Sequence, residues 1–419
     1  MDGRAGWQRT LYTLAFVQFV SAVGFSSIFT FLPLYIKELG STSGLSVELL
    51  TGLVFSAQAF AMMLAAPVWG ALADRHGRKM MVLRATWGGA VIIALMGFAR
   101  SAEELLVLRI LQGLITGVFS ALTALVVASV PRERTGYALG LLQVGLWGGI
   151  SAGPLLGGFI ADQFSFRASF LATAALLAVA GVLTSWSVHE HFVPIPHMSG
   201  GGNGFIAAWG HVLSNHGVRL TFIARFMNTL GRTMIEPFTP LLVSQLMHDD
   251  SPTATITGLL LAISAAAGTV AAIYLGQLGD RVGHRHILIT VALAAGVFYL
   301  PTLLVHAVWQ LGLILMLTGA AAGGILPTLS ALLATYTEPG EEGAVYGLEA
   351  AIVSAGRTIA PLIAAALATW FGLRSIYLVV GIIFLGLAFV AKRWLPSPFR
   401  RTQVASASLS AGGHRRIAR

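Results

Sequence analysis

Residues 70–85, GALADRHGRKMMVLRA, recur in altered form as GQLGDRVGHRHILITV at residues 276–291. Asp74 and Asp280 are 206 residues apart (280 − 74). A repeat at a fixed spacing indicates a repeated structural unit, so we predict two homologous halves. Four further pairs keep the spacing to within one residue: Phe31-Leu-Pro33 with Phe238-Thr-Pro240, Gly113 and Gly117 with Gly319 and Gly323, Pro154 with Pro361, and Phe166-Arg167 with Leu373-Arg374.

The composition is that of a membrane protein. Of the 419 residues, 56% are hydrophobic and only 10% are charged, whereas about a quarter of a soluble domain is charged. Residues 170–187 are uncharged and lack the alternation of a transmembrane barrel strand, and a helix satisfies every backbone group in lipid. We predict an all-α polytopic protein with twelve transmembrane helices in two pseudo-symmetric six-helix bundles. The predicted spans are 11–36, 50–72, 80–99, 104–128, 136–160, 167–187, 217–246, 254–277, 286–305, 308–336, 343–368 and 373–394.

The net charge of +9 follows the membrane topology. Because basic loops remain in the cytoplasm, both termini are predicted to be cytoplasmic, and the charge does not indicate a nucleic-acid partner. The chain has no cysteine, which excludes disulfides and thiolate metal sites. The loops after even-numbered spans contain Arg75, Arg78, Lys79, Arg84, Arg132, Arg134, Arg219, Arg281 and Arg285, and those after odd-numbered spans contain only Lys37, Arg100, Arg167 and Arg374.

The chain divides into four predicted regions. Residues 1–187 form the first bundle, and residues 217–395 form the second. Residues 188–216, rich in His, Pro and Gly, are typical of a cytoplasmic linker, and residues 396–419 of a disordered cytoplasmic tail. We interpret the linker histidines His189, His191 and His197 as solvated and expect no metal site.

The loop after the second span contains Gly70, Asp74, Arg75, Gly77, Arg78 and Lys79. Glycines permit a tight reversal, and an aspartate beside a helix N-terminus is stabilised by free N–H groups. The pattern resembles motif A of the major facilitator superfamily, with Asp280 and Arg281 as a weaker copy. The resemblance implies that Asp74 contacts the eleventh span and holds the outward-facing state. The alternative interpretation is a well-anchored turn alone.

Arg109 lies inside the fourth predicted span. A charged side chain in lipid is costly unless it faces protein or water, so Arg109 is a candidate for function. Gln112 and Thr116 follow on the same helical face. With Gly113 the pattern is similar to motif B of the drug:proton antiporters, although Arg109 could also serve only to tie helices together.

The fifth span contains Gly149, Gly153, Pro154, Gly157 and Gly158. Small residues at this spacing allow close helix approach, and proline bends the helix. The stretch resembles motif C, which in the family is typical of antiporters. The second half keeps only the proline, Pro361.

These motifs together resemble the twelve-helix drug:proton antiporters over the whole chain. The resemblance implies a monomeric protein of the bacterial inner membrane. It also implies that the protein has no cofactor and uses the proton gradient as its energy source. Its partners would be the lipid bilayer, small-molecule substrates and H⁺. We expect efflux of hydrophobic or amphipathic compounds by alternating access. Export of one specific metabolite, sugar or lipid, a membrane enzyme and a transporter-like sensor are the alternatives.

Proton coupling requires a carboxylate outside the first span, because residues 11–36 contain no acidic residue. Glu236 and Glu349 are the candidates within spans. We favour Glu236, which shares a helical stripe with Asn228 and Arg232, and a permanent Arg232–Glu236 ion pair is the alternative. Glu349 could instead lie at the interface near motif A. The expected cavity lining includes Phe25, Phe119 and Phe226, because aromatic side chains suit bulky solutes.

Overall fold

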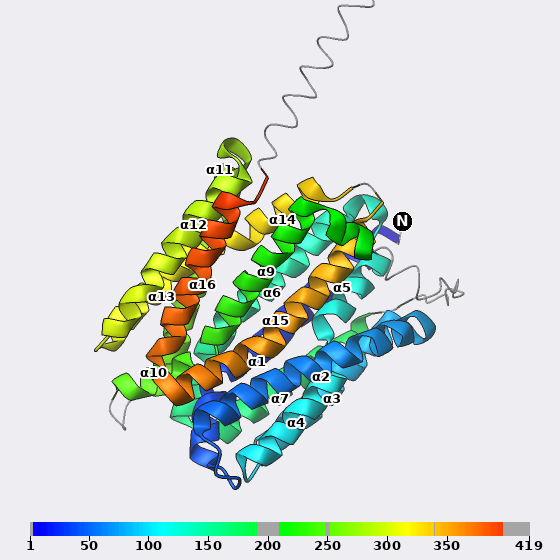
Figure 1. Ribbon diagram of the computed structural model, residues 1–419. Helices are drawn as coiled ribbons and strands as arrows, with labels where there is room; N and C mark the ends of the chain where they lie inside the picture. Colours follow the sequence, from blue (N-terminus) through cyan, green and yellow to red (C-terminus); the bar gives the residue numbers. More distant parts are fainter. Residues whose placement is uncertain (1–2, 189, 191–208, 248–251, 339, 397–419) are drawn as a thin grey trace, which may run out of the picture.

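The computed structural model describes residues 3–188, 190, 209–247, 252–338 and 340–396. Within these ranges the regular secondary structure is helical, and Figure 1 shows the helices arranged as a long bundle. The first half contains α1 (Gly3–Leu39), α2 (Val47–His76), α3 (Arg78–Met96), α4 (Ala102–Ile115), α5 (Val118–Ser129), η1 (Arg132–Arg134), α6 (Thr135–Gln163) and α7 (Phe166–Ser187). The second half contains α9 (His216–Ile235), α10 (Thr239–Leu246), α11 (Thr253–Val282), α12 (His284–Tyr299), η2 (Leu300–Leu304), α13 (Val308–Gly323), α14 (Ile325–Tyr336), α15 (Glu342–Phe371) and α16 (Arg374–Arg393).

Eleven helical segments of the described chain are long and apolar enough to cross a membrane. The remaining predicted span, 217–246, is not one helix, which corrects the prediction. It divides into α9 and α10, with a turn over residues 236–238. Pro237 lies in that turn and lacks a backbone N–H, so a continuous helix would lose a hydrogen bond there.

The fourth and tenth spans are also interrupted, at equivalent positions of the repeat. α4 ends at Ile115 and α5 begins at Val118, because Gly117 has a φ of 127° that a helix cannot accommodate. α13 ends at Gly323, which pairs with Gly117 in the repeat, and α14 begins at Ile325. The predicted continuous helices over 104–128 and 308–336 are therefore corrected to broken ones.

The sequence repeat appears in the structure as a repeated turn. Gly77 separates α2 from α3 with a φ of 93°, and Gly283 separates α11 from α12 with a φ of 95°. Both positions need the positive φ that glycine adopts without strain. The two basic segments of the repeat thus occupy the same place in their halves.

The two halves meet near the starts of α2 and α11. Ser46, which caps α2, contacts Thr369 of α15 with 3.2 Å between their hydroxyl oxygens. Asp162 at the end of α6 contacts the start of α11. Figure 1 shows α2 beside α15. We call this the closed end of the molecule. Because α2 and α11 both start there, residues 74–79 and 280–285 both lie at the opposite end, the basic end.

The predicted linker, 188–216, is helical over residues 209–214 rather than a loop. Val212 is buried and belongs to a cluster with Val218, Phe222 and Leu333 of the second half. This part of the linker therefore packs onto the second bundle. Residues 191–208, which include His191 and His197, His189, and the predicted tail from residue 397 onward lie outside the described residues.

Candidate functional site

Motif A lies at the basic end of α2 and the start of α3. Asp74 and Arg75 are exposed and make no hydrogen bond or ion pair with the described residues. The contact between Asp74 and the eleventh span, α15, that the family resemblance implies is therefore not made in this conformation. In the weaker copy, Asp280 forms an ion pair with His284, with 3.3 Å between Oδ1 and Nε2.

The start of α3 is capped by a carboxylate that sequence reasoning missed. Glu190 accepts the backbone N–H groups of Arg78 at 3.0 Å and of Lys79 at 2.8 Å. Lys79 also donates its ammonium to the carbonyl of Ser185, at 3.0 Å. An anion is stabilised at a helix N-terminus, so motif A is tied to the end of α7. The sequence signal for this cap was Glu190 itself, a carboxylate three residues after the end of the predicted sixth span.

Arg109 is fully buried between α4 and α2. Its Nη1 donates to the side-chain oxygens of Gln58 at 3.0 Å and Gln112 at 2.9 Å. Its guanidinium lies 5.4 Å from the ring centroid of Phe55. Nε and Nη2 make no hydrogen bond with the described residues. Arg109 is thus held by neutral amides, and none of the described carboxylates forms an ion pair with it.

Gly113 makes this arrangement possible. A Cβ at that position would lie 2.9 Å from the Cβ of Ala61 and would overlap the backbone carbonyl of Gln58. The glycine therefore lets α2 approach closely enough for Gln58 to accept from Arg109. Sequence reasoning missed Gln58 because it lies on another helix.

The break after α4 leaves carbonyl groups that two other side chains satisfy. Trp69 donates its indole N–H to the carbonyl of Leu114 at 2.6 Å, and Arg84 donates to that of Thr116 at 3.4 Å. The Arg84 guanidinium stacks 3.6 Å from the Trp69 ring centroid. Backbone groups in a membrane interior need such partners. Trp69 and Arg84 therefore stabilise the break in the helix by binding the carbonyl groups that it exposes.

The motif C glycines pack α6 against α1. A Cβ at Gly149 would lie 2.5 Å from that of Ala22, and one at Gly157 would lie 2.5 Å from that of Ser27. A Cβ at Gly153 would overlap the hydroxyl of Ser26. Close helix contact of this kind requires glycine.

Gly158 and Pro154 face the other half instead. A Cβ at Gly158 would overlap the backbone of Ala254, and Gly258 lies equally close to the carbonyl of Pro154. Motif C therefore serves two contacts, one within its half and one between α6 and α11.

Asp162 extends this contact between the halves. Its carboxylate accepts the backbone N–H of Ala254 at 3.3 Å and of Thr255 at 2.6 Å, at the start of α11. Thr369, which contacts Ser46 at the start of α2, is 207 residues later. That is the repeat spacing to within one residue, so the two contacts are related by the pseudo-symmetry. Sequence reasoning identified neither.

We expect Asp162→Asn to weaken the closed end. The amide removes the negative charge from the α11 N-terminus, where a carboxylate contributes up to about 2 kcal/mol, so the closing equilibrium should shift roughly five- to thirtyfold. Because the chain has no cysteine, a Ser46→Cys, Thr369→Cys pair reports closure by disulfide formation.

Slower cross-linking in Asp162→Asn is the expected result. Glu38→Gln is the matched control, because Glu38 is an exposed carboxylate at the same end of the first half. Equal cross-linking rates in both variants would contradict a role for the Asp162 charge.

Arg225 of α9 and Glu349 of α15 form an ion pair, with 3.0 Å between Nε and Oε1. The two side chains are 17% and 14% exposed. Although Nε lies close to Glu349, its geometry is not that of a hydrogen bond. Nη1 of Arg225 is also buried and makes no hydrogen bond with a described residue. Glu349 therefore belongs to a charge cluster within the second half.

Glu236 lies at the break between α9 and α10 and is partly buried. It forms no ion pair with Arg232, so the alternative of a permanent pair is wrong for this conformation. Tyr299 lies within electrostatic range of both side chains. Asn228, one helical turn before Arg232, is buried and its Oδ1 has no described partner. The predicted stripe is present, with Glu236 as a free carboxylate.

The aromatic residues predicted to line a cavity are partly buried. Phe25 and Phe119 contact edge to face, with 5.8 Å between ring centroids. Phe226 lies beside α15, where a Cβ at Gly356 would be 3.6 Å from its ring. Phe25 and Phe119 thus pack within the first half, and Phe226 lies near the Arg225–Glu349 pair.

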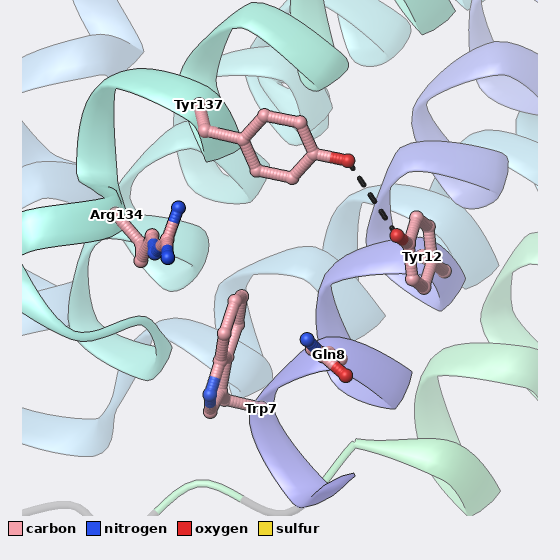
Figure 2. Close-up of a pocket in the computed structure, with 5 residues that line it drawn as sticks. All are labelled: Trp7, Gln8, Tyr12, Arg134 and Tyr137. Atoms are coloured by element: carbon pink, nitrogen blue, oxygen red, sulfur yellow. Dashed lines mark hydrogen bonds between the residues drawn. The ribbon is translucent and has the colours of Figure 1, made fainter. Parts of the chain in front are cut away.

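A pocket lies at the basic end between α1 and α6, lined by Trp7, Gln8, Tyr12, Arg134 and Tyr137 (Figure 2). The hydroxyl groups of Tyr12 and Tyr137 lie 3.5 Å apart. Aromatic residues of this kind are typical of membrane–water interfaces.

One group of side chains has the spacing of metal ligands. His211, Glu338 and Glu341 place a ligand atom each within 4.8 Å of one another, and His211 forms an ion pair with Glu341 at 3.3 Å. His211 and Glu338 are exposed. Exposed acidic groups commonly lie together without an ion, so this geometry alone does not define a metal centre.

Two halves of helices, closed against each other at one end, are the architecture of a secondary transporter. The family model of the Major Facilitator Superfamily matches residues 14–248 and 221–415. The chain therefore belongs to that superfamily, which confirms the predicted family and fold class. It is a family of transporters and not a class of enzymes.

One curated protein agrees with this assignment, and two solved structures agree with the fold. Multidrug resistance protein MdtG of Salmonella dublin is 34% identical over 381 residues, 90% of this chain and 93% of the relative. A bacterial homologue of the human lysosomal transporter Spinster, solved in an inward-facing and occupied conformation, has a TM-score of 0.75 at 13% identity, over 92% of this chain and 96% of that one. The human organic anion transporter MFSD10 has a TM-score of 0.65 at 20% identity, over 92% and 99%.

Proposed function

We propose that this protein is a proton-driven exporter of amphipathic small molecules in a bacterial inner membrane, with its basic end in the cytoplasm. The observation that carries the proposal is the asymmetry between the two ends. The halves contact each other through Asp162 and Thr369 at the closed end, whereas Asp74 is unengaged at the basic end. In a transporter built from two halves, one end is closed while the other is open, and the two ends exchange these states during transport.

The distribution of charge supports this orientation. Basic loops remain in the cytoplasm, and residues 75–79 and 281–285 lie at the basic end. With this orientation the structure corresponds to an inward-facing state, and engagement of Asp74 with α15 belongs to the outward-facing one.

Multidrug efflux is supported by the resemblance to the multidrug resistance protein MdtG. In this proposal Glu236 carries the proton and the gradient supplies the energy, so no organic cofactor or metal takes part. The working unit is a monomer whose partners are lipid, H⁺ and small-molecule substrates.

Flux in proteoliposomes tests the function. With an imposed pH gradient, we expect uphill movement of several chemically unrelated amphipathic compounds, and equilibration only when the gradient is collapsed. Movement of a single compound would indicate an exporter of one specific metabolite, sugar or lipid. Binding without flux would indicate a sensor and would overturn the proposal.

A further inference from the structure

Away from the helix ends, the charged residues of the described spans are mostly arginines. They are Arg84, Arg109, Arg225, Arg232 and Arg357, whereas the carboxylates are Glu349 and, in the break directly after α9, Glu236. A charge in hydrocarbon is costly, so these groups face protein or a water-filled path. The interior of the bundle therefore has an excess of positive charge.

Three of these arginines lie on two neighbouring helices, Arg225 and Arg232 on α9 and Arg357 on α15. Arg232 and Arg357 both lie within electrostatic range of Arg225. Neither forms a hydrogen bond or ion pair with a described residue. Glu349 is the carboxylate paired within the cluster, at 3.0 Å from Arg225. We call Arg225, Arg232 and Arg357 the arginine cluster.

The arginine cluster is accessible from an aqueous space. Arg357 is exposed although it lies in the middle of α15, Glu342–Phe371. A guanidinium at that depth cannot face lipid without a large cost, so its exposed side faces the path between the halves. Phe226 lies against Gly356, the residue before Arg357, and adds an apolar surface next to the charges.

We propose that the arginine cluster binds the anionic group of an amphipathic organic anion, such as a carboxylate or sulfonate. This rests on the proposed function and specifies its substrate class. Guanidinium groups bind such anions through paired hydrogen bonds. In the absence of substrate, Glu349 occupies Arg225 as an internal competitor, and Phe226 contacts the apolar part of the ligand. An organic cation of the same shape is disfavoured by like charge.

The test compares two dyes with the same xanthene ring system and opposite charge at neutral pH. Fluorescein is the anion, and tetramethylrhodamine methyl ester is the cation. Fluorescence anisotropy of the purified full-length protein measures the Kd of each dye. We expect fluorescein to bind at least about tenfold more tightly than the cation, and Arg225→Gln and Arg357→Gln each to weaken it about tenfold.

Glu349→Gln separates ligand binding from a structural role. Because it removes the competing carboxylate, it should tighten fluorescein binding, whereas a structural ion pair would give the opposite result. Arg219→Gln is the matched control, since Arg219 is an exposed arginine on the same helix and lies outside the cluster. Arg357→Gln removes no described hydrogen bond or ion pair, so we expect it to fold normally. It therefore tests the arginine cluster even if Arg225→Gln misfolds.

Several outcomes would overturn the anion site. They are equal or tighter binding of the cation, an unchanged fluorescein Kd in Arg357→Gln, and weaker binding in Glu349→Gln. Flux of both dyes under a pH gradient distinguishes the two proposals. Fluorescein that binds as expected but is not transported leaves the site intact and contradicts export. Transport of the cation alone supports export and contradicts the anion site.

Discussion

Gly158→Val is expected to abolish transport while both halves remain folded. Any Cβ at Gly158 overlaps the backbone of Ala254 in the opposite half, and a backbone cannot rotate away as a side chain can. Overpacking of this kind costs about 1–3 kcal/mol, which shifts the closing equilibrium roughly five- to 150-fold. The closed end would then stay open, and the transport cycle would stop.

Disulfide formation between Ser46→Cys and Thr369→Cys measures this effect directly, because their hydroxyl oxygens lie 3.2 Å apart in the closed end. Gly140→Val is the matched control, since Gly140 lies on the same helix and a Cβ there would meet nothing within 4 Å. Cross-linking and transport at unmodified rates in Gly158→Val would show that this contact is not needed for closure.

Glu236→Gln is expected to abolish uphill efflux driven by a pH gradient. Glu236 is a partly buried carboxylate at a helix break, without an ion-pair partner among the described residues. Glutamine keeps its size and polarity but cannot release a proton. The accumulation ratio should fall to the value set by substrate gradients alone, whereas exchange of substrate without a pH gradient should continue.

Proteoliposomes assayed with and without the pH gradient separate these two activities. Glu38→Gln provides the control for loss of an exposed carboxylate at the end of α1. Retention of pH-driven accumulation in Glu236→Gln, with its loss in Glu349→Gln, would transfer proton coupling to the carboxylate that pairs with Arg225.

The fold could be predicted from local pattern and repetition. The spacing between Asp74 and Asp280 indicated two halves, and long uncharged segments indicated the spans. The interruptions were harder, because a hydropathy pattern continues across a break. A glycine such as Gly117 does not by itself predict a helix break, because glycines are common in the spans. Pro237, directly after Glu236, was a usable signal for the break in the seventh span.

The site was predictable only where its parts lie on one helix. Motif C glycines and the stripe of Asn228, Arg232 and Glu236 follow from helical periodicity. The partners of Arg109 and Arg225 do not, because Gln58 and Glu349 come from helices distant in sequence. Carboxylates that cap helices, such as Asp162 and Glu190, bind backbone groups, which no side-chain pattern reveals.

The interruption of the fourth span also affects how the first half can deform. The carbonyls of Leu114 and Thr116 already bind Trp69 and Arg84 instead of the next turn of helix. Bending between α4 and α5 therefore sacrifices no intrahelical hydrogen bond at that point. The first half therefore has a joint between α4 and α5 at which it can bend.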